Sequence, residues 1–121
     1  MPPKTDARSA RGRSGEEAAL HTYERRGYTL VARNWRCPLG ELDLVLRRGD
    51  LLVVCEVKAR SGTAFGGGYE SVTWSKRRKL RTLAEAFIER NGLHRARVRF
   101  DVASVWLGRG DPDVELFQDA F

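Results

Sequence analysis

The sequence predicts an α/β domain in which helices flank a central mixed β-sheet, and three observations support this fold class. Residues 51–55 are apolar at every position, as in a strand that is buried on both faces. Residues 41–47 carry leucines at alternate positions, as in a neighbouring strand. Residues 16–23 and 80–88 repeat apolar side chains at helical spacing, which predicts helices that pack on the sheet.

The composition is that of one small domain with a basic surface. A chain of 121 residues with 41% hydrophobic content can bury a single modest core. The formal net charge of +6 favours a polyanionic partner, without choosing among DNA, RNA and acidic surfaces. No apolar run approaches the roughly 18 residues of a membrane helix, and the first residues lack the apolar core of a signal peptide. We therefore expect no membrane partner and a cytoplasmic location.

The N-terminal region predicts a flexible arm followed by a helix. Residues 1–13 are rich in proline and basic side chains, so we expect a flexible basic arm that either attracts phosphates or only increases solubility. A single domain would then span residues 14–121. Its first helix should start at a capping box formed by Ser14 and Glu17 and end at Gly27. One inward stripe of this helix contains Glu16, Ala19, Leu20 and Tyr23.

The first strand is expected at residues 28–36. Leu30 and Ala32 should share one face of it, because side chains alternate along a strand. Trp35, near the end of this strand, can pack in the core or present a platform for base stacking. Packing is the commoner role of a large aromatic side chain.

Residues 41–47 and 51–60 predict an antiparallel hairpin. The Gly-Asp pair at residues 49–50 suits a two-residue turn between them. If Arg48 and Leu51 close that turn, the register of the whole hairpin follows. A slip by one residue would send every side chain of one strand to the other face, so the pairing depends on this turn.

This register places Asp43 opposite Glu56 and Glu41 opposite Lys58. Directly opposed residues have Cβ atoms about 4.5–5.5 Å apart, close enough for two carboxylates to share one divalent cation. Charged side chains are rarely buried unless they are paired or bind a metal, so the charges in this strand need an explanation. A metal site is one explanation, and a structural ion pair between Glu41 and Lys58 is the other.

Asp43, twelve intervening residues and then Glu56-Val57-Lys58 resemble the motif of the PD-(D/E)xK nuclease superfamily. The chain also resembles the YraN-like family of small bacterial proteins over nearly its whole length after about residue 13. The matching segments are Gly15-Glu16-Glu17-Ala18-Ala19, Gly27-Tyr28, Arg33-Asn34-Trp35-Arg36, Gly40-Glu41-Leu42-Asp43-Leu44-Val45, Glu56-Val57-Lys58-Ala59-Arg60 and Arg99-Phe100-Asp101-Val102. Leu42 stands where the superfamily motif has proline, a departure that YraN-like proteins share.

The resemblance implies a restriction-endonuclease-like core, similar in fold to archaeal Holliday-junction resolvases. It also implies that Asp43, Glu56 and the Val57 carbonyl bind Mg²⁺ or Mn²⁺. Lys58 would orient the attacking water or stabilise the phosphate in the transition state. Glu16 matches a further acidic residue of such sites and would bind the metal directly or through water. The alternative for Glu16 is a favourable charge at a helix N-terminus, worth about 0.3–1 kcal/mol.

A loop at residues 61–69 should leave the candidate metal site. Its triple glycine suits either a plain linker or a segment that orders over nucleic acid through Phe65 and Tyr69. A second helix should follow, starting near residue 71 or 73 and ending at Asn91-Gly92. Its inward stripe contains Leu80, Leu83, Ala84, Phe87 and Ile88, and one turn upstream this stripe reaches Lys76.

The basic cluster of the second helix is a candidate contact for nucleic acid. We expect Lys76 to approach the site, while its neighbours and Arg60 meet phosphates. These neighbours are Arg77, Arg78 and Lys79. A solvated helix surface is the alternative.

The C-terminal region predicts a long strand and a short one. Residues 95–107 alternate apolar side chains with Arg97, Arg99 and Asp101, as in a strand with one wet face, and residues 114–117 suit an edge strand. The cysteines and histidines of the chain, Cys37, Cys55, His21 and His94, are scattered singly and do not predict a zinc site.

Together these expectations favour a structure-directed DNA endonuclease of the junction-resolvase type, dependent on Mg²⁺ or Mn²⁺, which acts on branched or structured DNA in repair or recombination. A resolvase must cut two symmetric strands, so a homodimer is expected under this interpretation. One alternative is a non-catalytic nucleic-acid-binding module that retains the nuclease fold. Another is a protein-protein adaptor that uses its basic face on an acidic partner.

Overall fold

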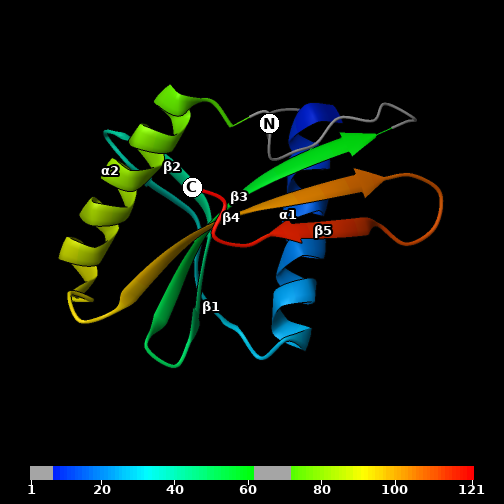
Figure 1. The fold of residues 1–121 in the computed structure, drawn as a ribbon. Coiled ribbons are helices and arrows are strands. Elements are labelled where there is room, and N and C mark those ends of the chain that lie inside the picture. Colours follow the sequence, from blue (N-terminus) through cyan, green and yellow to red (C-terminus); the bar gives the residue numbers. More distant parts are fainter. Residues whose placement is uncertain (1–6, 62–71) are drawn as a thin grey trace, which may run out of the picture.

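The computed structural model describes residues 7–61 and 72–121. Within these ranges the chain forms, in order, α1 (Ala7–Arg25), β1 (Thr29–Cys37), β2 (Gly40–Arg48), β3 (Leu51–Ser61), α2 (Trp74–Asn91), β4 (Arg97–Leu107) and β5 (Asp113–Phe117) (Figure 1). The expected loop contacts at Phe65 and Tyr69 lie outside the described residues. Neither helix is long and apolar enough to cross a membrane.

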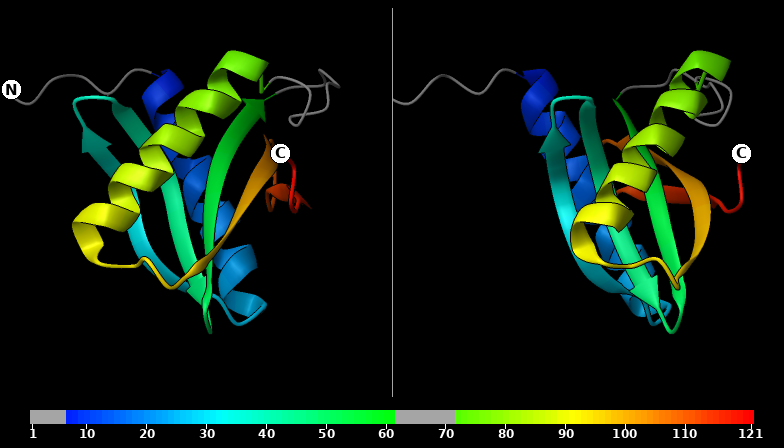
Figure 2. Two further views of the ribbon diagram at one scale, coloured as in Figure 1. Left: turned by 60° about the vertical axis from the view of Figure 1, so that its left-hand side comes forward. Right: turned by 90° about the vertical axis from the view of Figure 1, so that its left-hand side faces the viewer.

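The strands form one mixed sheet in the order β1-β2-β3-β4-β5. Neighbouring strands are antiparallel except β3 and β4, which are parallel because the chain returns through α2 between them. The two helices cover opposite faces of this sheet (Figure 2). The predicted fold class, an α/β core with a restriction-endonuclease-like sheet flanked by helices, is therefore confirmed.

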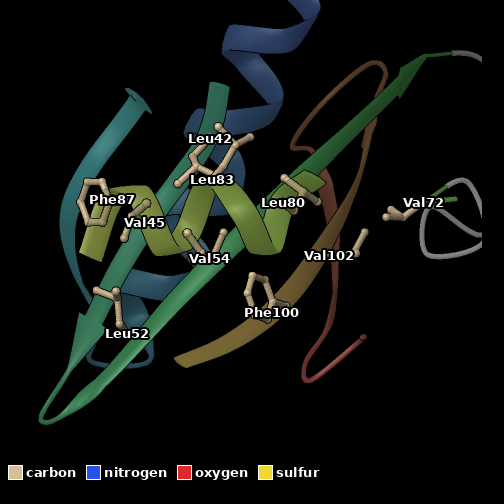
Figure 3. Close-up of a cluster of buried hydrophobic side chains, with 11 residues drawn as sticks. Leu42, Val45, Leu52, Val54, Val72, Leu80, Leu83, Phe87, Phe100 and Val102 are labelled. Carbon is tan, nitrogen blue, oxygen red and sulfur yellow. The ribbon is translucent and has the colours of Figure 1, made fainter. Parts of the chain in front are cut away.

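Each helix buries the stripe that its sequence predicts. Ala19, Leu20 and Tyr23 of α1 pack on one face of the sheet, in a cluster with β2, β3 and β4. On the other face, α2 covers a second cluster that extends from β2 to β4 (Figure 3). The buried side chains of α2 in this cluster are Leu80, Leu83, Ala84 and Phe87. The sheet between the helices is thus buried on both faces, as the apolar stretch of β3 predicts.

The start of α1 differs from the prediction. The helix begins at Ala7, so Ser14 lies inside it and does not cap it. Residues 7–13 of the expected arm therefore belong to the helix, while residues 1–6 lie outside the described part of the chain. The end of α1 is as predicted, because Gly27 follows it with a φ of 89°, a backbone conformation that glycine adopts without strain.

β1 contains a bulge that alternation in the sequence does not reveal. Its pairing with β2 shifts between Leu30 and Ala32, so that Leu30 pairs with Leu46 and Ala32 with Val45. Leu46 belongs to the cluster under α1 and Val45 to the cluster under α2. Leu30 and Ala32 consequently face opposite sides of the sheet, and the prediction that they share a face is wrong.

The ends of α2 and the packing of Trp35 follow the prediction. The Thr73 hydroxyl accepts a hydrogen bond from the Lys76 N–H and caps the start of the helix, and Gly92 adopts a left-handed conformation after its end. The Trp35 ring packs edge-on against Phe87 with ring centroids 5.2 Å apart, so its role is packing.

β4 does not have the wet face that its alternation predicts. Asp101 is completely buried and accepts hydrogen bonds from the Tyr23 hydroxyl at 2.7 Å and from the Arg99 guanidinium at 2.8 Å. The backbone N–H of Asp119 donates a further bond at 3.0 Å. Burial raises the pKa of Tyr23, which keeps its hydroxyl a donor. Asp101 and Arg99 therefore join β4 to Tyr23 and Tyr28 instead of facing solvent, whereas Arg97 at the start of β4 is exposed and binds Asp50.

Candidate functional site

The candidate site forms where β2 separates from β3. The pairing of these strands runs from the turn as far as Leu44 and Cys55, which confirms the predicted register. Asp43 follows next, and its carboxylate accepts a hydrogen bond from the backbone N–H of Val57 at 2.9 Å. A side chain thus satisfies a donor that the neighbouring backbone no longer reaches. As a result, Asp43 is held beside β3 at the level of Glu56.

Asp43 and Glu56 form a carboxylate pair in which Asp43 is half-buried and Glu56 is buried. Glu56 exposes only 8% of its surface. Burial, followed by the charge of Glu56, raises the pKa of Asp43 to about 7, although the Val57 N–H acts in the opposite direction. Near neutral pH the pair is therefore stabilised by a proton or by a cation.

Glu16 reaches the neighbourhood of this pair from α1. Its pKa is raised, mainly by burial and further by the negative charge of Asp43. The Asn34 side-chain amide donates a hydrogen bond to the Glu16 carboxylate at 3.1 Å, and the Arg33 guanidinium approaches it at 3.4 Å. Arg33 also binds Glu17, at 2.6 Å. Contacts from β1 therefore fix the orientation of Glu16.

Asn34 belongs to one of the matching segments quoted above, but the sequence analysis gave it no role at the site. Its neighbours Arg33 and Trp35 pair with the residues on either side of Asp43. Its φ of 53° is in a region that asparagine tolerates better than most residues. The signal in the sequence was an asparagine inside an otherwise regular strand, where this residue is depleted. Its amide connects the strand that carries it to Glu16 of α1.

Lys58 and Arg60 continue the face of Glu56 along β3, because alternate residues of a strand share a face. Lys58 pairs with Ser104 of the parallel strand β4. In the described part of the chain, the Ser104 hydroxyl and the Nε of Arg60 are buried without a hydrogen-bond partner. Beyond Glu56, this face therefore carries polar groups in place of the apolar side chains that precede it.

The alternative partner of Lys58 is engaged elsewhere. The Glu41 carboxylate binds the guanidinium of Arg36 at 3.2 Å, across the hairpin of β1 and β2. Among residues 7–61 and 72–121, no ion pair joins Glu41 to Lys58. The geometry thus does not support the structural explanation for the lysine.

α2 brings one cation to the carboxylate pair. The Lys76 ammonium lies 3.7 Å from the Glu56 carboxylate, as its place on the inward stripe predicts. Arg77 donates to a backbone carbonyl just before the helix, at 3.1 Å. Arg78 and Lys79 are exposed on the surface of the same helix. The structure therefore places Lys76 beside Glu56, whereas Arg78 and Lys79 lie on the exposed surface of the helix.

The donor set at the pair fits a hard divalent cation. Mg²⁺ is often bound by one or two carboxylates and keeps several waters. Asp43 and Glu56 offer two carboxylates, and the Val57 carbonyl points to the same lateral side as its N–H, toward Asp43. Within the described ranges, no group of three or more His, Cys, Asp or Glu side chains is arranged to hold a metal ion. Glu16 is not a third member of such a group, and its carboxylate accepts a hydrogen bond from Asn34.

These features define a class: a small α/β protein with a restriction-endonuclease-like core and a partly buried carboxylate pair at the end of its central hairpin. A family model described as "Uncharacterised protein family UPF0102" matches residues 15–105. The chain belongs to this family, the YraN-like group, as its motifs predict.

Relatives in the family resemble the chain over almost its full length. A UPF0102 protein of Rhodococcus jostii is 43% identical, over 93% of this chain and 96% of the relative. Another, from Acidothermus cellulolyticus, is 43% identical over the whole of both chains. A third, from Moorella thermoacetica, is 43% identical over 97% of this chain and 99% of the relative. The similarity therefore extends over the whole domain, and residues 15–105 of the family match include the strands that carry Asp43 and Glu56.

Proposed function

We propose that this protein is an endonuclease that depends on Mg²⁺ or Mn²⁺ and hydrolyses phosphodiester bonds in branched or structured DNA in the cytoplasm. The observation that carries the proposal is the pair formed by half-buried Asp43 and buried Glu56, because a divalent cation would remove the repulsion between their charges. The resemblance to junction resolvases supports the choice of substrate, and the net charge of +6 is consistent with it.

The residues of the site would share the work of hydrolysis. Asp43 and Glu56 would hold the cation through carboxylate oxygens, with the Val57 carbonyl and, through water, Glu16 completing its surroundings. A bound divalent cation lowers the pKa of water and neutralises charge on the phosphate. Lys58, on the same face as Glu56, would orient the attacking water or donate a hydrogen bond to the charge that develops on the phosphate.

Basic side chains around the site would bind the rest of the substrate. Lys76 lies beside Glu56, and Arg60 follows Lys58 on the same face of β3. Phosphates on either side of the cleaved bond would meet Arg60 and the basic residues of α2. Those residues are Lys76, Arg77, Arg78 and Lys79. Contacts of this kind give affinity without reading the sequence of bases.

A second candidate function has its own supporting observation. The Lys76 ammonium already lies 3.7 Å from Glu56, and Asn34 and Arg33 already bind Glu16. Side chains that donate hydrogen bonds or carry positive charge can stabilise these carboxylates in the folded protein without a metal ion. This favours, as the alternative, a nucleic-acid-binding module that does not cut.

Cleavage of labelled DNA separates these functions. A four-way junction, a nicked duplex, a single strand and a plain duplex are each incubated with Mg²⁺, with Mn²⁺ or with chelator. The wild type is compared with Asp43→Ala and with Asp111→Ala, which removes an exposed carboxylate from the turn after β4. Cutting that needs metal, prefers the junction and disappears only in Asp43→Ala is the expected result.

Other outcomes have equally definite meanings. Binding without metal-dependent cutting would favour the non-catalytic module. An absence of salt-sensitive binding to any of the four DNAs would leave only the protein-protein adaptor. Sedimentation of the protein with and without the junction tests the homodimer that symmetric cutting requires.

A further inference from the structure

Trp74, the first residue of α2, has the most exposed large hydrophobic side chain in the described part of the chain. It exposes 73% of its surface, whereas the next, Leu39, exposes 52%. By contrast, Trp35 packs against Phe87. Burial of an indole is strongly favourable, so an indole left in solvent forgoes a large stabilisation and is available to a partner.

Basic side chains accompany this indole on the same helix. Residues four positions apart lie on one face of a helix, so the exposed Arg78 shares a face with Trp74. Arg77, three positions along, is half-buried, and its guanidinium donates to the Val72 carbonyl at 3.1 Å. An aromatic surface between cations is the combination that binds unpaired nucleic acid, in which bases stack on the ring and the cations meet the backbone. An acidic protein would use the cations but has no particular need of the indole.

Trp74 lies on the same turn of α2 as Lys76, which reaches the carboxylate pair. Lys76, two residues further along α2, has its ammonium 3.7 Å from the Glu56 carboxylate. Cα atoms two residues apart in a helix are separated by on the order of 5 Å. The hydroxyl of Thr73 caps this turn, so the indole is carried by an ordered helix end. Side chains two residues apart project from nearly opposite sides of a helix, so a base stacked on Trp74 would lie across the start of α2 from Lys76 and the carboxylate pair.

We propose that Trp74 stacks on an unpaired base of the nucleic acid whose phosphate is held at Asp43 and Glu56. The substrate must then present an unstacked base at the site, as a single strand, a flap or the branch point of a junction does. Inside an uninterrupted duplex both faces of each base are already covered by neighbouring pairs. The position of the phosphate rests on the proposed function, whereas stacking on Trp74 does not require cleavage.

The test is a binding measurement on the full-length protein in chelator, so that no DNA is cut. A single strand, a flap, a four-way junction and a blunt duplex are compared, each with 2-aminopurine as the base expected to stack. The variants are Trp74→Ala, Trp74→Phe and the control Val31→Ala, which shortens another exposed apolar side chain on the edge strand β1. Thermal unfolding of each variant checks that it is folded.

We expect Trp74→Ala to weaken binding to the three DNAs with unpaired bases by about tenfold, the loss typical of one base-aromatic contact. Affinity for the duplex and its salt dependence should stay unchanged, because the cations remain. Quenching of 2-aminopurine by the wild type should be lost in Trp74→Ala and largely kept in Trp74→Phe. Val31→Ala should behave as wild type.

Two results would overturn the inference. One is an equal loss of affinity for duplex and unpaired DNA, and the other is no loss for any DNA, which would assign Trp74 to a protein contact. If the wild type cuts with metal but Trp74→Ala binds every DNA as well as the wild type does, the stacking is refuted and the proposed function stands. If the wild type never cuts but Trp74→Ala loses affinity for single strands, the proposed nuclease function is refuted and the stacking stands.

Discussion

The Asp43 carboxylate accepts a hydrogen bond from the Val57 backbone N–H at 2.9 Å, one residue beyond the last pair of the ladder between β2 and β3. This bond has two consequences. It supplies β3 with an acceptor where the backbone of β2 has moved away, and it holds Asp43 next to Glu56 even though burial and the second carboxylate disfavour its charge. A substitution at Asp43 therefore acts on stability and on the candidate chemistry at once.

Asp43→Asn should make the metal-free protein more stable at alkaline pH. The folded protein raises the pKa of Asp43 from an ordinary value of 3.8 to about 7. The carboxyl thus contributes fully at low pH, where it is protonated, and loses that contribution as the pH rises through about 7. Asparagine stays neutral and can still accept from Val57. The advantage of Asn should be on the order of 2 kcal/mol near pH 8, because one pKa unit is about 1.4 kcal/mol and a partly exposed group is screened.

Urea unfolding in chelator at about pH 5 and about pH 8 measures this difference. Asp111→Asn, in the exposed turn after β4, is the matched control and should change little at either pH. Parallel losses of stability in wild type and Asp43→Asn across this range would contradict the prediction.

Mg²⁺ or Mn²⁺ should stabilise the wild type against thermal unfolding near pH 8. Binding to the folded state alone adds about 2.7 kcal/mol when the free cation is at a hundred times its dissociation constant. Asp43→Asn and Glu56→Gln each remove a carboxylate ligand, so the rise in Tm on addition of metal should largely vanish. Asp111→Asn should keep it. Equal rises in all four proteins would show that the metal binds elsewhere.

Lys76→Met should tighten the binding of Mn²⁺. The Lys76 ammonium lies 3.7 Å from Glu56, so it competes with a cation for the same carboxylate. The side chain of Lys76 is 39% exposed, so the competition is weakened by solvent and we expect an effect of about two- to fivefold in Kd. Titration calorimetry measures it, and Lys79→Met on the exposed surface of α2 is the control. Weaker binding in Lys76→Met would mean that the lysine supports the metal site instead of competing with it.

Features set by residues close together in the sequence were predicted correctly, whereas features set by contacts between distant residues were missed. The register of β2 and β3 was predictable because a two-residue turn adjacent to both strands sets it. The stripes of both helices were predictable because helical spacing is local. Asp101 reads as a solvent-facing residue, since nothing near it in sequence indicates that Tyr23 and Arg99 will enclose it.

In the candidate site, too, the residues of one hairpin were predicted and those that depend on distant contacts were missed. Asp43 and Glu56 belong to one hairpin, and their proximity follows from its turn. Asn34 was missed because its partner, Glu16, is on another element and because its positive φ appears only in the folded backbone. Trp74 was missed because sequence does not distinguish an indole that packs from one that stays exposed.

Asp101→Asn should destabilise the fold without touching the candidate site. The change removes the charge that Arg99 binds through two hydrogen bonds of 2.8 Å and leaves a largely buried guanidinium without its counter-ion. Loss of one partner of a buried ion pair costs about 3–5 kcal/mol. Tyr23→Phe removes only one hydrogen bond to the same carboxylate, so about 1–2 kcal/mol is expected. Denaturant unfolding measures both, and a loss below that of Tyr23→Phe would contradict the account.

Gly15→Ala should push α1 away from β3. A Cβ at Gly15 would lie 2.6 Å from the Cβ of Ala59 and 3.5 Å from a methyl group of Val57, so the helix must shift. We expect a loss of about 1–3 kcal/mol, typical of overpacking, even though alanine is the better helix former. Gly12→Ala in the same helix is the matched control, because nothing lies within 4 Å of the added Cβ. That variant should gain up to about 1 kcal/mol.

The double variant Gly15→Ala with Ala59→Gly tests the cause of this loss. Removal of the Ala59 methyl group relieves the contact, so the two changes together should cost less than the sum of their separate costs. Because Glu16 follows Gly15 directly, the shift of α1 should also lengthen its bond to Asn34, and metal binding should fall in Gly15→Ala and recover in the double variant. Strictly additive stabilities would show that close approach of α1 to β3 is not what excludes a side chain at Gly15.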